Sequence, residues 1–254
     1  MKQLVDILDS DLTMSQSKQD NHIPAIHIRD SALLGSFGGT LMPKPKEYIF
    51  DVANKQEFRD WYLTAKSQTI IINDMKMNSL SQNALSPMSY MCHEFMKPPS
   101  RDKDRLEDNI GKPFVFYCGL HSSPEDEFYG AEGILRSFII QLLEAYGHKI
   151  DLSFLDPIAI QELQAHYVPR LQSLLEKIMY GIGVGVVFLL IDGISWYERD
   201  AQIEKTTMVM SFLGDLVEKM EARQTGLILK PLITTTGFNR RARMWFPNAI
   251  ELFM

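Results

Sequence analysis

The stretch Val186-Val187-Phe188-Leu189-Leu190-Ile191-Asp192-Gly193-Ile194 decides the fold class of this chain. An uninterrupted apolar run, half of it β-branched, ends abruptly in an aspartate and a glycine. Such a run is typical of a strand buried on both faces, and strands of that kind belong to parallel sheets covered by helices. In open α/β sheets ligands bind beyond the carboxyl ends of the strands, which is where Asp192 would lie.

Further segments extend this pattern along the chain. Three more apolar, β-branched or aromatic runs predict strands at residues 69–72, 114–118 and 227–234. Helical patterns occupy residues 57–65, 88–96, 134–143, 158–179 and 212–220. Buried strands that alternate with amphipathic helices predict an α/β fold, a three-layer sandwich with a mostly parallel sheet and right-handed crossovers.

The domain organisation follows from where this pattern begins. Residues 1–45 have no sustained period and contain Gly35, Gly38, Gly39 and the Pro43-Lys44-Pro45 segment, so we expect an N-terminal arm or linker there. Residues 46–254 are expected to form the α/β domain. A chain of 254 residues is long enough for one sizeable core.

Composition excludes several classes of function. A net charge of -6 gives no general attraction to nucleic-acid phosphates, so no nucleic-acid partner is expected. The apolar run at residues 181–191 is about half of the ~20 residues that cross a bilayer, so no membrane segment is expected. With only Cys92 and Cys118, and with aspartates in the first twelve positions where a secretory signal would be apolar, we expect a cytoplasmic location.

Asp192 admits two interpretations. A carboxylate at the end of a parallel strand can hold Mg²⁺ beside nucleotide phosphates, which is the Walker B role in P-loop enzymes. An aspartate in this position can also simply cap the turn that follows a buried strand. The strand pattern by itself favours the second interpretation.

The order of several segments carries a family resemblance. They are 114–121 and 130–137, a strand and the start of a helix, then 190–193, then 232–236 with Arg240 and Arg241. This order resembles the NACHT-type branch of the STAND NTPases, particularly the fungal proteins similar to the nephrocystin-like NTPase domain, over roughly residues 60–250. The resemblance implies a P-loop NTPase-like signalling domain that uses ATP or GTP with Mg²⁺ at Asp192. It places Arg240 and Arg241 in the phosphate-sensing region, although no arginine directly follows the strand as the family pattern requires.

The sequence departs from that family at the phosphate-binding loop. A P-loop needs G-x-x-x-x-G-K-[ST] after the first strand, but residues 73–86 contain no glycine. Lys76 and either Ser79 or Ser81 would have to replace its lysine and hydroxyl. Losing two or three charge-assisted contacts at about 1.5 to 3 kcal/mol each would weaken nucleotide binding by roughly two to six powers of ten.

A second departure follows Asp192. NACHT-type motifs place acidic residues in the next few positions, where they orient the attacking water, but here Ser195 and Trp196 occupy that place. Glu198 and Asp126 are the remaining candidates for that role. Loss of a general base costs roughly a hundredfold to ten-thousandfold in rate.

Two functions therefore remain in view. The first is a binding or regulatory module with protein partners, built on a degenerate NACHT-like domain. Its phosphate-binding loop is incomplete, so enzymatic activity is left open and is not favoured. The alternative is a Mg²⁺-dependent nucleoside triphosphatase with a non-standard P-loop. The chain could also be a fragment of a longer signalling protein, since such family members continue into further helical regions and repeats.

Three other motifs give weaker indications of function. Cys118 and His121 have the spacing of half a metal site, but a structural zinc needs four ligands, and a cysteine that ends an apolar strand is usually a buried hydrophobe. The glycines at 181, 183 and 185 precede a strand, whereas a dinucleotide fingerprint follows one. Gly111-Lys112-Pro113 opens a strand and is no displaced P-loop.

Overall fold

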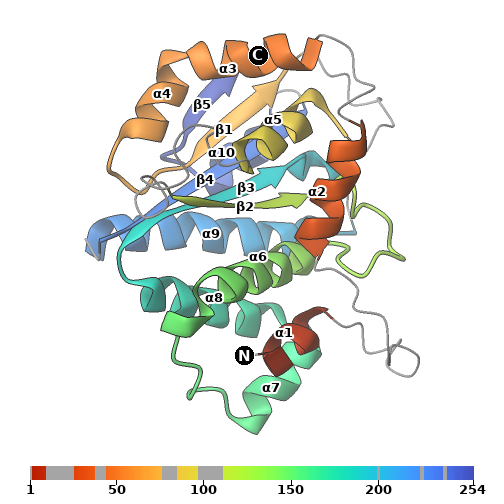
Figure 1. Ribbon diagram of the computed structural model, residues 1–254, viewed down its shortest axis with the longest axis vertical. Coiled ribbons are helices and arrows are strands. Elements are labelled where there is room, and N and C mark those ends of the chain that lie inside the picture. The colour runs from red at the N-terminus through yellow and green to blue at the C-terminus, as the bar shows by residue number, and fades with distance from the viewer. Residues whose placement is uncertain are drawn as a thin grey trace.

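The computed structural model describes residues 2–9, 26–37, 44–75, 85–96, 111–198, 201–223, 226–236 and 239–254. Within them a five-stranded, all-parallel sheet is covered by helices on both faces, so the predicted α/β sandwich is confirmed (Figure 1). Among the helices of these residues, none combines the length and the apolar composition that a membrane span requires.

The sheet has the strand order β2-β3-β4-β1-β5. Its strands are β1 (Ile70–Asp74), β2 (Lys112–Tyr117), β3 (Gly185–Asp192), β4 (Leu227–Thr236) and β5 (Ile250–Phe253). The first four are the predicted strands, and they lie in one parallel sheet. The fifth pairs with β1 and was not predicted, because four residues are too few to show a pattern.

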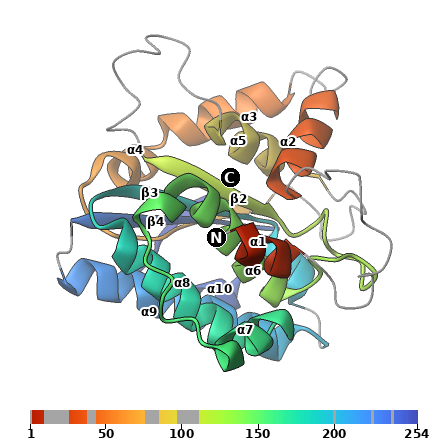
Figure 2. The same ribbon diagram turned by 60° about the horizontal axis from the view of Figure 1, so that its bottom comes forward.

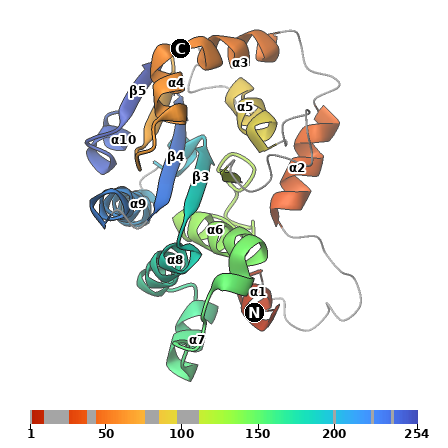
Figure 3. The ribbon, with the colours of Figure 1, turned by 60° about the vertical axis from the view of Figure 1, so that its left-hand side comes forward.

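Helices cover each face of this sheet (Figures 1 and 3). One face carries α3 (Lys44–Asn54), α4 (Gln56–Leu63) and α5 (Pro87–Met96). The other carries α6 (Ala131–Tyr146), α8 (Val168–Ile182), α9 (Ile203–Arg223) and the short α10 (Arg240–Trp245), with α7 (Pro157–Gln164) packed outside α8.

Strand residues alternate between two buried clusters, one on each side of the sheet. Ile71 and Ile191 belong to the cluster under α6, α8 and α9, whereas Ile70, Ile72 and Leu190 belong to the cluster under α3, α4 and α5. Because both faces need apolar residues, the strands read as unbroken apolar runs.

Two helices of the described ranges lie wholly before residue 45. The first is α1 (Lys2–Asp9), which lies beside α6 and α7 (Figure 2). The second is α2 (Ile26–Phe37), which contacts the edge strand β2 and helices on both faces of the sheet. Leu8 of α1 is fully buried, and α2 inserts Ile26 into one cluster and Leu34 into the other. The buried core therefore includes side chains from the segment expected to be an arm.

The topology has a switch point between β1 and β4. The chain leaves β1 toward α5 on one face of the sheet, and it leaves the neighbouring β4 toward α10 on the opposite face. Adjacent strands whose connections diverge in this way leave an opening beyond their carboxyl ends, where ligands of open α/β sheets bind. Asp192 ends β3, the strand next to β4.

Candidate functional site

Asp192 forms the centre of a closed hydrogen-bond network at the carboxyl edge of the sheet. Its side chain is 3% exposed. Oδ1 accepts a hydrogen bond from the Thr234 hydroxyl at 2.7 Å, and Oδ2 accepts one from the Ser89 hydroxyl at 2.5 Å. The Thr234 oxygen in turn accepts the backbone N–H of Gly193 at 2.8 Å. Three elements, α5, β3 and β4, are joined by this one carboxylate.

Ser89 is a site residue that the sequence reasoning missed. It lies in the first turn of α5, whose start is capped by the Ser86 hydroxyl, which accepts the N–H of Met88 at 3.1 Å. The order Ser86-Pro87 is a sequence signal for a helix start, and it places Ser89 in the first turn, where its side chain reaches the sheet. The predicted phosphate-loop residues Lys76, Ser79 and Ser81 lie outside the described residues.

Burial dominates the electrostatics of Asp192. Desolvation raises the pKa of this carboxyl above its ordinary value, although the hydrogen bonds from Ser89 and Thr234 act in the opposite direction. Burial, followed by the nearby Asp192, also raises the pKa of the Cys92 and Cys118 thiols. No lysine or arginine of the described ranges forms an ion pair with Asp192.

A second polar layer lies at the ends of β1 and β4. The Asn73 side-chain oxygen accepts the Thr235 hydroxyl at 2.9 Å and the N–H of Asn239 at 3.4 Å. The Ser195 hydroxyl oxygen accepts the N–H of Thr236 at 3.1 Å. These contacts between uncharged groups hold the carboxyl ends of β1 and β4 in place.

Glu198 and Arg241, two residues predicted from the sequence, lie close together beside that layer. The Asn239 amide donates to the Glu198 carboxylate, and the Arg241 guanidinium donates to the Glu198 backbone carbonyl at 3.3 Å. Burial raises the pKa of Glu198, opposed by Asn239 and Arg241. Arg240 begins α10, and its side chain lies outside the described part of the chain.

Asp126 belongs to a different cluster. Its carboxylate lies 2.8 Å from Nδ1 of His121, whose Nε2 lies 3.1 Å from Asp30 of α2. Burial alone would lower the pKa of His121, but the hydrogen bonds to the two aspartates raise it to about 9. For Asp126 burial acts upward, and the contacts with His121 leave its pKa lowered. The geometry therefore commits Asp126 to an ion pair, and it makes no contact with Asp192.

The metal hypothesis for Cys118 and His121 gains no further ligand. Cys118 is fully buried and His121 faces the two aspartates. Over the ranges that the structure covers, no group of three or more His, Cys, Asp or Glu side chains is placed to hold a metal ion. Asp192 and Ser89 supply two oxygen ligands of the kind Mg²⁺ prefers, should their network open.

Comparison with known proteins adds no family assignment. The chain matches no protein-family model, and no curated protein has a significantly similar sequence. The NACHT-type resemblance therefore rests on the sequence segments given above and stays a prediction.

Proposed function

We propose that this chain is a binding or regulatory module with protein partners, built on a P-loop-NTPase-like sheet whose nucleotide chemistry is weak or lost. The observation that carries the proposal is the closure of Asp192. Both carboxylate oxygens are engaged by hydroxyls of the chain itself, and the side chain is almost fully buried.

A closed, buried carboxylate suits a structural role better than metal binding. A Mg²⁺ ion would have to displace the Ser89 or Thr234 hydroxyl and ionise a group whose pKa burial has raised. In P-loop enzymes this cost is offset by the phosphate contacts that a glycine-rich loop and its lysine make. Residues 73–86 lack the glycines that such a loop requires.

One observation favours the alternative, a Mg²⁺-dependent nucleoside triphosphatase. P-loop enzymes hold Mg²⁺ between a hydroxyl at the start of the helix after the first strand and an aspartate ending another strand. Ser89 and Asp192 have that relationship, so Ser89 replaces Ser79 and Ser81 as the candidate hydroxyl. Glu198, whose pKa is raised, would be the group that accepts a proton from water in this alternative.

A cytoplasmic location is part of the proposal. Both cysteines are free and buried, and a reducing compartment suits such thiols.

The experiment that separates the two functions is calorimetric titration with ATP, ADP and GTP in the presence of Mg²⁺. Ser89→Ala and Asp192→Ala test the network, and Asp215→Ala, an exposed acid on α9, is the matched control. Absence of binding at millimolar nucleotide supports the binding module. The triphosphatase would instead be supported by micromolar binding that Ser89→Ala and Asp192→Ala both weaken and that Asp215→Ala leaves unchanged.

A further inference from the structure

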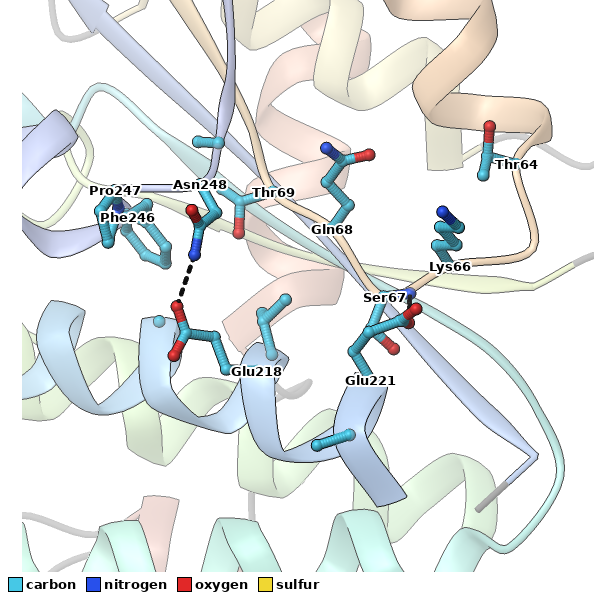
Figure 4. A pocket seen from close by; sticks show the side chains of 14 residues that line it. Thr64, Lys66, Ser67, Gln68, Thr69, Glu218, Glu221, Phe246, Pro247 and Asn248 are labelled. Atoms are coloured by element: carbon cyan, nitrogen blue, oxygen red, sulfur yellow. Dashed lines mark hydrogen bonds between the residues drawn. The ribbon is translucent and has the colours of Figure 1, made fainter. Parts of the chain in front are cut away.

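A groove lies at the opposite end of the sheet from Asp192, where β1 and β5 begin. Its volume is about 640 Å³, and its walls come from the loop before β1, the second half of α9 and the segment after α10 (Figure 4). That volume falls in the range of small-ligand sites. The groove shares no residue with the Asp192 network.

One buried polar group in this groove lacks a partner. Thr69 is 3% exposed, and its hydroxyl oxygen has no hydrogen-bond partner among the described residues. Figure 4 shows this hydroxyl turned toward α9. Leaving a buried hydroxyl unpaired costs free energy, and nearly all such groups in native proteins are paired. A ligand in the groove would supply the missing partner.

The groove is also acidic. Glu218 and Glu221 lie on one side of α9, near its carboxyl-terminal end, where the helix dipole favours cations. Oε1 of Glu218 accepts the Asn248 amide at 2.9 Å, and Oε2 of Glu221 accepts the N–H of Ser67 at 2.7 Å. In each carboxylate the other oxygen makes no hydrogen bond or ion pair within the described residues.

Nearby cations compensate this charge only in part. Lys219 is paired with Glu176 at 2.9 Å, and the Arg223 guanidinium lies over the Tyr180 ring at 4.6 Å, so neither faces the groove. Lys230 acts electrostatically on Glu221 from the other face of the sheet, and Lys66 lines the groove itself. Glu218 is therefore the acid with the least compensation.

We propose that this groove binds a guanidinium group carried on a short aliphatic chain. A planar guanidinium donates a charge-assisted fork of hydrogen bonds to the Glu218 carboxylate, and one further N–H reaches the Thr69 hydroxyl oxygen. Val217, Phe246 and Pro247 provide apolar wall for the aliphatic stem. The guanidinium can belong to a free small molecule or to an arginine of a partner protein.

The test is calorimetric titration of the full chain with two probes, agmatine and a tripeptide with a central arginine and blocked termini. Thr69→Val removes the hydroxyl with little change in shape, Thr69→Ser retains it, and Glu218→Gln removes the charge. Glu204→Gln makes the same charge change in the exposed first turn of α9, away from the groove. Circular dichroism checks that each variant is folded.

Binding should weaken about tenfold in Glu218→Gln and about threefold in Thr69→Val, while Thr69→Ser and Glu204→Gln stay close to the parent chain. Tighter binding of agmatine supports a free small molecule as the natural ligand, and tighter binding of the tripeptide supports an arginine of a partner. The proposal is overturned if neither probe binds at millimolar concentration, or if Glu204→Gln weakens binding as much as Glu218→Gln.

Discussion

The Ser89 hydroxyl donates a hydrogen bond of 2.5 Å to Oδ2 of Asp192, a residue 103 positions later in the sequence. This contact ties the first turn of α5 to the end of β3. Since both groups are buried, Oδ2 of Asp192 would lack a donor without the serine, whereas Oδ1 would keep the Thr234 hydroxyl. Ser89→Ala should therefore lower the free energy of unfolding by about 1 to 3 kcal/mol. Denaturant titration measures this loss, and Ser36→Ala, at an exposed serine on α2, should change stability much less.

Asp192→Asn should alter how stability depends on pH. The folded-state pKa of Asp192 is raised above 3.8, so ionisation of this residue penalises the folded state. The penalty is absent below 3.8 and grows as pH rises through the raised pKa. An asparagine can accept from Thr234 and donate to the Ser89 oxygen without carrying charge. The difference in unfolding free energy between variant and parent should therefore shift in favour of the variant as pH rises from about 3.8; a pH-independent difference would contradict the assigned direction.

His121 should confer stability that is lost in mildly alkaline solution. Its pKa is raised from 6.5 to about 9, so the contribution is fully present below pH 6.5 and disappears as pH rises through about 9. At 1.36 kcal/mol for each pH unit between 6.5 and 9, this contribution is roughly 3 kcal/mol. Denaturant titrations from about pH 6 to 10 should show the loss in the parent chain and not in His121→Gln. His148→Gln, at an exposed histidine, should behave like the parent.

Two glycines provide a test of close packing. A Cβ built on Gly133 would lie 1.9 Å from the Phe128 carbonyl oxygen, whereas one on Gly35 meets nothing within 4 Å. Gly133→Ala must move backbone and should cost about 1 to 3 kcal/mol. Gly35→Ala should stabilise α2 by about 0.5 to 1 kcal/mol, because alanine loses less conformational freedom in a helix. Thermal unfolding measures both changes: Gly133→Ala should lower the melting temperature, and Gly35→Ala should raise it.

Leu8 tests whether the first helix is part of the folded unit. It is fully buried, and its carbonyl accepts a hydrogen bond from the Arg136 side chain at 2.8 Å. Leu8→Ala should destabilise the whole domain by about 2 to 5 kcal/mol. Ile28→Ala, at a position that is half exposed, serves as the control. Equal stability of Leu8→Ala and the parent chain would mean that α1 contributes nothing to the core.

The sequence predicted those parts of the fold that have long, uniform patterns. Four strands could be located because both of their faces are buried, which produces β-branched apolar runs. The position of Asp192 at a strand end followed from the same pattern. The strand β5 could not be located in this way, since four residues carry too little periodicity, and α1 was missed although Leu4 and Leu8 have helical spacing.

The site was harder to predict because its contacts join distant segments. The sequence offers Ser79 or Ser81 as the hydroxyl of an altered phosphate loop, whereas the structure brings Ser89 to Asp192. Nothing local in the sequence indicates that His121 meets Asp30, which is 91 residues away. Asp126 is a candidate general base when the sequence is considered alone, and only its contact with His121 in the folded chain shows that it is an ion-pair partner.

The position of β1 constrains how the chain can fold during synthesis. Ile70 lies opposite Leu232 on one side and Ile250 on the other, so both neighbours of this strand come from the last tenth of the chain or close to it. While a ribosome is still making the chain, β2 and β3 can pair, but β1 waits with both hydrogen-bonding edges open. Such long-range pairing slows folding and leaves a strand edge exposed to other chains. β1 can therefore complete its pairing only after both β4 and β5 have been made.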